Sequence, residues 1–483
     1  MAEPRSLSEP GSRVTSMDIS DRPATSRSKK NTPGRLARTD RITTAWLVAA
    51  LAVMAVGLST KNVLPQPLWT MIHVVTLAVL SNAIMQWTWF FARALLHLPA
   101  QDKRAGRDAT ARTIAFNVVL IGLVAAMWTA NVWGTVAGAT GIGVVIAWHG
   151  LALLLASRTK LGNRFAVVLR YYVASAAFLV LGCVLAGFLT VAMFDADAPA
   201  WLLEAREGIT VAHALVNVCG WVGLTIAGTL VTLWPTILRT KMDAGAPARA
   251  VAALPWMSAA ILVAATCAII EWMPGVGIGL LGLAAGLAFG VSVPMIASAR
   301  AKGLSNYATW TMAAAFIWIT VGLGAVAFHA FTSMSASALR AANLPWLPII
   351  GAGGLGQILM AALAYLMPVV IGGGPAVMRQ GMAILEFAAP TRVMLRNAAL
   401  ALLTASAISG AGSLTAWWVI VLACFAADVA ALAIAGIRQV RTGRTAKRVI
   451  SARLHVPTQA AVPPNASNSS APTNGVNNDQ PNL

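Results

Sequence analysis

Apolar stretches of helix length dominate this chain and constrain its fold more than any other feature. Each approaches the roughly 20 residues that a helix needs to cross a bilayer. Charged residues make up only 11% of the chain, whereas a soluble domain of this size carries about a quarter. We therefore predict an all-α fold, a polytopic membrane bundle of about 12 transmembrane helices. The spans are expected at about 42–59, 67–91, 112–128, 134–157, 166–190, 208–236, 251–271, 274–299, 306–331, 345–371, 394–410 and 414–437.

The basic residues predict how the bundle is oriented. The formal net charge is +19, with 35 Lys and Arg residues. If the N-terminus lies inside, only Lys61, Arg206 and Arg340 fall outside the inner segments. Positive residues concentrate on the cytoplasmic side of membrane proteins. We therefore expect a multi-pass protein of the bacterial plasma membrane with both termini cytoplasmic. Its basic charge suits anionic lipid, and we expect no nucleic-acid partner.

Composition also predicts the domain boundaries. Residues 1–40 are rich in Ser, Arg, Pro and Thr, and no apolar signal-peptide core precedes Thr43. The chain beyond about 455 is rich in Pro, Asn and Ser. We predict a disordered basic cytoplasmic tail over 1–40, a transmembrane domain over 41–438 and a disordered cytoplasmic tail over 439–483.

One apolar helix is repeated along the chain. Gly220, Leu230 and Pro235 of the sixth span are matched 133 positions later by Gly353, Leu363 and Pro368. A weaker echo of the same helix lies in the second span, 140 positions before the sixth. The echoed spans are four helices apart, and an even number of crossings returns the chain to the same side. We therefore predict three parallel four-helix repeats around a pseudo-threefold axis.

Histidines at matched positions in these repeats are candidate ligands. His73 and His213 occupy equivalent places in the outer third of the membrane, and His329 reaches the same depth. The third repeat has Trp346 at this position. Neutral imidazole binds haem iron and copper well. We predict a haem or copper cofactor held by His73 and His213, with His213 and His329 as metal ligands. The alternative is that each histidine only hydrogen-bonds a neighbouring helix.

Other polar residues lie within the same spans. Asn82 and Gln86 share a helix face, as do His213 and Asn217, because residues four apart are neighbours on a helix. Asp428 is the carboxylate deepest in a span. These side chains either orient the histidines, line a path through the membrane, or join helices by hydrogen bonds. For Asp428, a role with protons or cations and pairing with a helix N-terminus or hydroxyl both remain open.

The line that begins at His213, H-x3-N-x2-G-W-V-G-L-T, resembles the haem–copper oxidase subunit I superfamily. The likeness is to the divergent bacterial membrane domains found with cupredoxin-type nitrite reductases and multicopper oxidases. The resemblance implies that His73 ligates low-spin haem and that His213 binds copper. The span at 251–271 lacks the histidine pair of the oxidases, and the tenth span has Trp346, Gln357 and Tyr365 in place of its histidines. The full binuclear centre is therefore not expected.

The resemblance implies a haem- or copper-binding protein with a redox or accessory role in copper or nitrogen-oxide metabolism. A separate cupredoxin or other electron donor would be its partner, alongside the lipid bilayer. Two other functions stay open: a permease or channel for a small solute or metal, and a membrane scaffold for a partner protein. The sequence leaves open whether the protein is an enzyme.

Overall fold

The computed structural model describes residues 36–60, 63–99, 102–158 and 167–454. All regular secondary structure in these residues is helical. Eleven helical segments among them are long and apolar enough to cross a membrane. The prediction of a helical, multi-pass membrane bundle is therefore confirmed. The predictions for residues 1–35 and 455–483 fall outside the described residues.

The elements follow the predicted spans closely. The first four long helical segments are α1 (Leu36–Ser59), the continuous α2–η2–α3 (Pro67–His73, Val74–Leu80, Ser81–Leu95), α4 (Arg107–Trp128) and α5 (Val132–Ser157). The next four are α6 (Val167–Phe194), α7–η4–α8 (Ala200–Leu215, Val216–Gly223, Leu224–Leu238), α9 (Ala246–Ile269) and α10–η5–α11 (Met273–Leu287, Ala288–Ser292, Val293–Lys302). The last four are α12 (Tyr307–Thr332), η7–α14 (Ile349–Gly356, Gln357–Ile371), α16 (Ala389–Ser409) and α17 (Leu414–Leu454).

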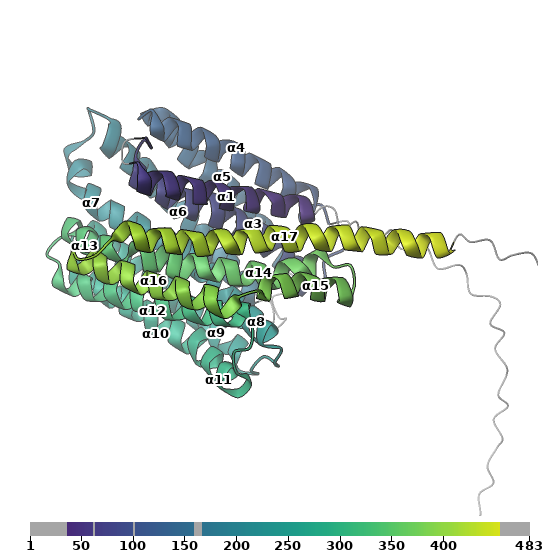
Figure 1. The fold of residues 1–483 in the computed structure, drawn as a ribbon. Helices are drawn as coiled ribbons and strands as arrows, with labels where there is room; N and C mark the ends of the chain where they lie inside the picture. Colours follow the sequence, from purple (N-terminus) through teal and green to yellow (C-terminus); the bar gives the residue numbers. More distant parts are fainter. Residues whose placement is uncertain (1–35, 61–62, 100–101, 159–166, 455–483) are drawn as a thin grey trace, which may run out of the picture.

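Short helices mark the two ends of the bundle. The long helices run roughly along one direction, with α13 (Ala336–Asn343) at one end and α15 (Pro375–Glu386) at the other (Figure 1). A 3-10 turn, η6 (Leu344–Trp346), connects α13 to the tenth span. We refer below to the α13 end and the α15 end. Helix α17 lies beside α16 and α14, and it extends past α15.

Helix α16 differs from the eleven apolar segments. It is 21 residues long and packs against α12 and α17. Arg392, Arg396 and Asn397 lower its hydropathy, so it is not among the segments that qualify by composition. The prediction of about twelve spans, which includes this helix, stays a prediction.

The three echoed helices share a backbone feature. Each contains a π-helical segment: η2 in the second long segment, η4 in the sixth and η7 in the tenth, and the eighth long segment contains a further one, η5. Segments η4 and η7 are 133 positions apart at both their first and last residues. Such segments widen the helix by one residue per turn and are frequent at functional sites. A Cβ atom at Gly220 or Gly228 would collide with Phe178 or Tyr171 of α6, so the glycines permit close helix packing.

The C-terminal boundary needs correction. The tail expected from residue 439 is helical as far as Leu454, because α17 continues beyond the span. Gln439 is buried and donates hydrogen bonds to the carbonyl oxygens of Pro368 and Gly372 at 2.6 and 2.9 Å. This contact fixes α17 to the end of α14 just past the predicted boundary at 438. At the other end, α1 already begins at Leu36, within the tail predicted over 1–40.

Candidate functional site

Two of the candidate histidines lie side by side toward the α13 end. His73 is the last residue of α2, directly before the π-helical η2. His213 lies in α7, three residues before η4. Their ring centroids are 6.2 Å apart, with an angle of 30° between the ring planes. Trp69 stacks on His73 at 4.2 Å. The fold therefore brings these two imidazoles together from separate helices.

Hydrogen bonds determine which ring nitrogens of this pair are free. Nδ1 of His73 lies 2.8 Å from the carbonyl oxygen of Trp69, and Nδ1 of His213 lies 3.0 Å from that of Gly182. A carbonyl oxygen can only accept, so each Nδ1 must carry a proton. In a neutral ring the proton is then absent from Nε2, which keeps its lone pair. Metal-binding histidines are commonly oriented by such a bond from the other ring nitrogen.

Asn217 lies against His213, as its spacing predicted. Its amide nitrogen lies 3.2 Å from Nε2 and 3.3 Å from Nδ1 of His213, and it donates to the His213 carbonyl at 2.9 Å. Its side-chain oxygen is buried and has no hydrogen-bond partner among the described residues. A Cβ atom at Gly182 would overlap this amide. Gly182 therefore both accepts from His213 and leaves room for Asn217.

The other histidines lie in different surroundings. Nδ1 of His329 lies 2.9 Å from the side-chain oxygen of Asn343. The His329 ring packs edge-on against Trp346 at 5.9 Å. Nε2 of His149 lies 3.0 Å from the hydroxyl of Thr88. In the part of the chain that the structure describes, no three His, Cys, Asp or Glu side chains form a group that could hold a metal ion.

Asn82 belongs to a triad of side chains from three helices. It is fully buried on α3 and exchanges two hydrogen bonds with Asn117 of α4, at 2.8 and 3.1 Å. The indole of Trp46, on α1, donates to the same Asn117 oxygen at 2.7 Å. Gln86 is half-buried one turn further along α3. Asn82 therefore joins helices, which was one of the three roles considered for it.

The last four long helices contain a triad with the same chemistry. Gln357 of α14 exchanges two hydrogen bonds with Asn397 of α16, at 2.9 and 3.2 Å. The indole of Trp318, on α12, donates to the Asn397 oxygen at 2.6 Å. In both triads the first helix supplies a tryptophan, the second an amide and the third an asparagine.

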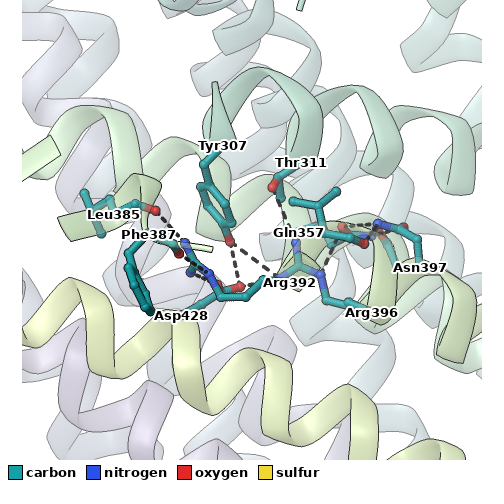
Figure 2. Close-up of polar contacts among 11 residues, drawn as sticks. Tyr307, Thr311, Gln357, Leu385, Phe387, Arg392, Arg396, Asn397 and Asp428 are labelled. Atoms are coloured by element: carbon teal, nitrogen blue, oxygen red, sulfur yellow. Dashed lines mark hydrogen bonds and ion pairs between the residues drawn. The ribbon is translucent and has the colours of Figure 1, made fainter. Parts of the chain in front are cut away.

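Asp428 lies in a charged cluster next to this second triad. Its carboxylate forms ion pairs with Arg392 and Arg396, both on α16 (Figure 2). It also accepts a hydrogen bond from the Tyr307 hydroxyl at 2.6 Å. The side chains of Asp428 and Arg396 are only 1% and 0% exposed. Arg396 also donates to Gln357 at 3.1 Å, so the cluster and the triad are connected.

The backbone N–H of Tyr307 donates to the Glu386 carboxylate at 2.9 Å, where α15 ends. Burial raises the pKa of the Glu386 carboxyl above its ordinary value, against the opposing effect of this hydrogen bond and of Arg392. Asp428 thus has ionic and hydroxyl partners on neighbouring helices, and the hydroxyl is one of the two partners the sequence left open.

Arg392, Arg396, Asn117 and Asn397 were not among the predicted site residues. The span predicted over 394–410 leaves Arg392 outside the membrane helix, whereas α16 begins at Ala389. A usable signal exists in the sequence. RTIAFN at 112–117 and RVMLRN at 392–397 both place an arginine five residues before the triad asparagine. A polar pair at this spacing in two otherwise apolar helices indicates matched positions.

Comparison of the chain with protein-family models and with curated proteins found no match.

Proposed function

We propose that His73 and His213 form a two-histidine metal site, with a copper ion as its occupant. The observation that carries the proposal is the hydrogen bonding of the rings: both Nδ1 atoms donate to backbone carbonyls, so the lone pair of each ring is on Nε2, and that of His213 faces only the Asn217 amide nitrogen at 3.2 Å. Imidazole suits copper. The rings are half-buried among apolar helices, where a polar side chain is costly without a role.

The separation of the rings fits a metal ion between them. A metal–nitrogen bond to histidine is about 2 Å long. With both Nε2 atoms turned toward one ion, two such bonds give a centroid separation of about 6 Å; the rings are stacked at 30° here, so the proposal requires both imidazoles to rotate edge-on to the ion. The observed separation is 6.2 Å. Zinc is disfavoured because it takes at least three protein ligands, and the described residues supply two here. Copper(I) accepts two nitrogen ligands.

The same separation would suit a haem iron between the two histidines, so haem is the competing occupant. The porphyrin would have to pass between the rings, next to Asn217, whose amide lies within 3.3 Å of both nitrogens of His213. A single ion requires no such space. Copper is therefore the proposed occupant, and the optical spectrum distinguishes it from haem.

We further propose that the bundle consists of three parallel four-helix units and is related to the haem–copper oxidase subunit I fold. Support comes from the π-helical segments η4 and η7, which lie 133 positions apart at both ends, and from the two matching triads. With both termini in the cytoplasm, as the distribution of basic residues predicts, the α15 end faces the cytoplasm of a bacterial cell and the histidines lie near the outer face. A copper ion there would serve a redox or accessory role in copper or nitrogen-oxide metabolism, with a separate cupredoxin as electron partner.

Metal analysis and optical spectroscopy of detergent-purified protein test this proposal. We expect about one copper per chain and no Soret band after growth with copper. His73→Ala and His213→Ala should each lose the copper, whereas His329→Ala should retain it as the matched control. Absence of both copper and haem from the wild-type protein would refute the site. Equal copper loss in all three variants would show that the ion is bound elsewhere.

A further inference from the structure

Arg112, on α4 near the α15 end, is a buried cation without an acidic partner. Its side chain is 0% exposed. It donates one hydrogen bond, to the carbonyl oxygen of Arg104 at 2.8 Å. Its guanidinium lies over the indoles of Trp89 and Trp148, at 4.9 and 5.3 Å from their ring centres. No carboxylate of the described residues lies within ion-pair distance of it. A buried arginine normally has a negative partner.

Several further donors around Arg112 have no acceptor. Arg93 of α3 donates to the carbonyl oxygen of Ala105 at 3.4 Å, next to the carbonyl that Arg112 uses. The buried atoms without a hydrogen-bond partner among the described residues include Nε and Nη1 of Arg112, Nε of Arg93, Nε1 of Trp89 and Nδ1 of His149. His149 packs edge-on against Trp89 at 6.4 Å. Except for the imidazole nitrogen, all of these atoms can only donate, so the region has excess donors.

The matched region at α16 and α17 shows what is missing. Arg112 and Arg392 each lie five residues before a triad asparagine. Asp428 lies 31 positions after Asn397, and Trp148 lies 31 positions after Asn117. Arg392 therefore meets a carboxylate at the position where Arg112 meets an indole. The α4–α5 region has the arginine but lacks the internal acid.

Nearby acids do not supply this charge. Asp102 binds Arg104 at 3.2 Å. Although partial burial opposes it, the pKa of Asp102 lies below its ordinary value because Arg104 donates hydrogen bonds to it. Asp108, one turn before Arg112, attracts it electrostatically but lies outside ion-pair distance, so it forms no direct pair with the guanidinium.

We propose that this region binds the phosphate group of an anionic lipid headgroup at the α15 end. Arginine forks form paired hydrogen bonds with phosphate oxygens, and basic pockets between transmembrane helices are a known type of headgroup site. Arg93 and Arg104 lie at its partly exposed rim. Trp148 is 43% exposed, so its ring covers Arg112 from the lipid side. Displacement of this indole gives the phosphate access to Nε and Nη1 of Arg112.

Native mass spectrometry and thermal unfolding of the full chain test the site. The protein is compared in phosphatidylcholine alone and with added phosphatidylglycerol, and separately with inorganic phosphate in the buffer. We expect phosphatidylglycerol to remain bound and to raise the unfolding midpoint. In Arg112→Gln its apparent affinity should fall about tenfold, the effect of losing one or two hydrogen bonds to a charged group. Arg93→Gln, at the rim, should weaken binding in the same direction and serves if Arg112→Gln fails to fold.

Arg300→Gln is the matched control, because Arg300 is an exposed arginine at the end of α11. It should bind phosphatidylglycerol as the wild-type protein does. Stabilisation by inorganic phosphate that is lost in Arg112→Gln would assign the site to a free anion and overturn the lipid proposal. No response to either probe would overturn it too. Equal losses in Arg300→Gln and Arg93→Gln would reduce the effect to general surface charge.

Discussion

The α4–α5 region and the α16–α17 region place an arginine at matched positions but neutralise it differently. Arg392 and Arg396 share the carboxylate of Asp428, which is buried with them. Arg112 lies between two indoles and has no acid within ion-pair distance among the described side chains. Both regions adjoin a triad of one tryptophan and two amides that joins three helices.

This difference separates two functions of polar side chains in the bundle. The triads use neutral groups that satisfy one another, so they can join helices without a charge. The arginines add a positive charge that must be neutralised. The α16–α17 region does so internally and is self-contained, whereas the α4–α5 region leaves its donors for an external anion. The desolvation cost of a buried ion pair is comparable to its Coulomb gain, so the free energies of unfolding of variants measure what each arrangement contributes.

Removal of the internal acid should have the largest effect. Asp428→Asn leaves two arginines buried without a carboxylate, and loss of one partner of a buried pair costs about 3–5 kcal/mol. We expect a large fall in the unfolding midpoint, measured by scanning fluorimetry in detergent. Asp197→Asn, at an exposed acid of the α6–α7 connection, should have no measurable effect. A loss below about 1 kcal/mol, the range of an exposed pair, would show that the Asp428 cluster is hydrated.

The two triads should respond alike to the same substitution. Asn117→Ala and Asn397→Ala each remove the acceptor of an indole N–H and the interhelical partner of an amide that keeps only its other bonds, which costs about 1–3 kcal/mol. Thr320→Ala is the control, because that exposed hydroxyl bonds only to its own helix and should change stability by less than about 0.5 kcal/mol. Unfolding midpoints of all three variants provide the measurement. A fall in the unfolding midpoint for only one of the two variants would mean that the triads share their geometry but not their contribution to stability.

Hydropathy predicted the helices because apolar length alone determines which segments can cross a membrane. Helix α16 is the exception, because its hydropathy does not identify it as a membrane span. Its arginines were counted with the basic residues of the inner side, because a charge count treats every arginine as solvated. Helix rotation instead directs Arg396 into the interior, where Asp428 of the following helix lies. Rotation depends on packing between helices, which hydropathy does not report.

The candidate site was predictable only where its residues belong to the echoed helices. Matched positions in the echoed helices placed His73 and His213 at one depth, and the structure places their rings 6.2 Å apart. The carbonyl partner of His213, Gly182, lies on another helix 31 positions away and has no side-chain signature. His329 was expected at the depth of the pair, and it bonds instead to Asn343 of the short helix α13, which hydropathy did not predict.

The substitution with the smallest expected effect on stability adds to the α4–α5 region the acid that it lacks. Trp148→Asp places a carboxylate where Asp428 lies in the matched region. The gain from the new ion pair is opposed by the cost of placing a carboxylate on the lipid-facing side of the helix, so the net change in stability should be small, about 1 kcal/mol or less. We expect the variant to lose most of the stabilisation by phosphatidylglycerol, since Arg112 would then have an internal partner. Trp133→Asp, at a 75% exposed indole near the start of α5, should keep the wild-type response to the lipid. The measurement is the shift in unfolding midpoint on adding phosphatidylglycerol. An unchanged shift in Trp148→Asp would show that Arg112 does not bind the lipid phosphate. The contrast between Arg112 and Arg392 would then have no consequence for lipid binding.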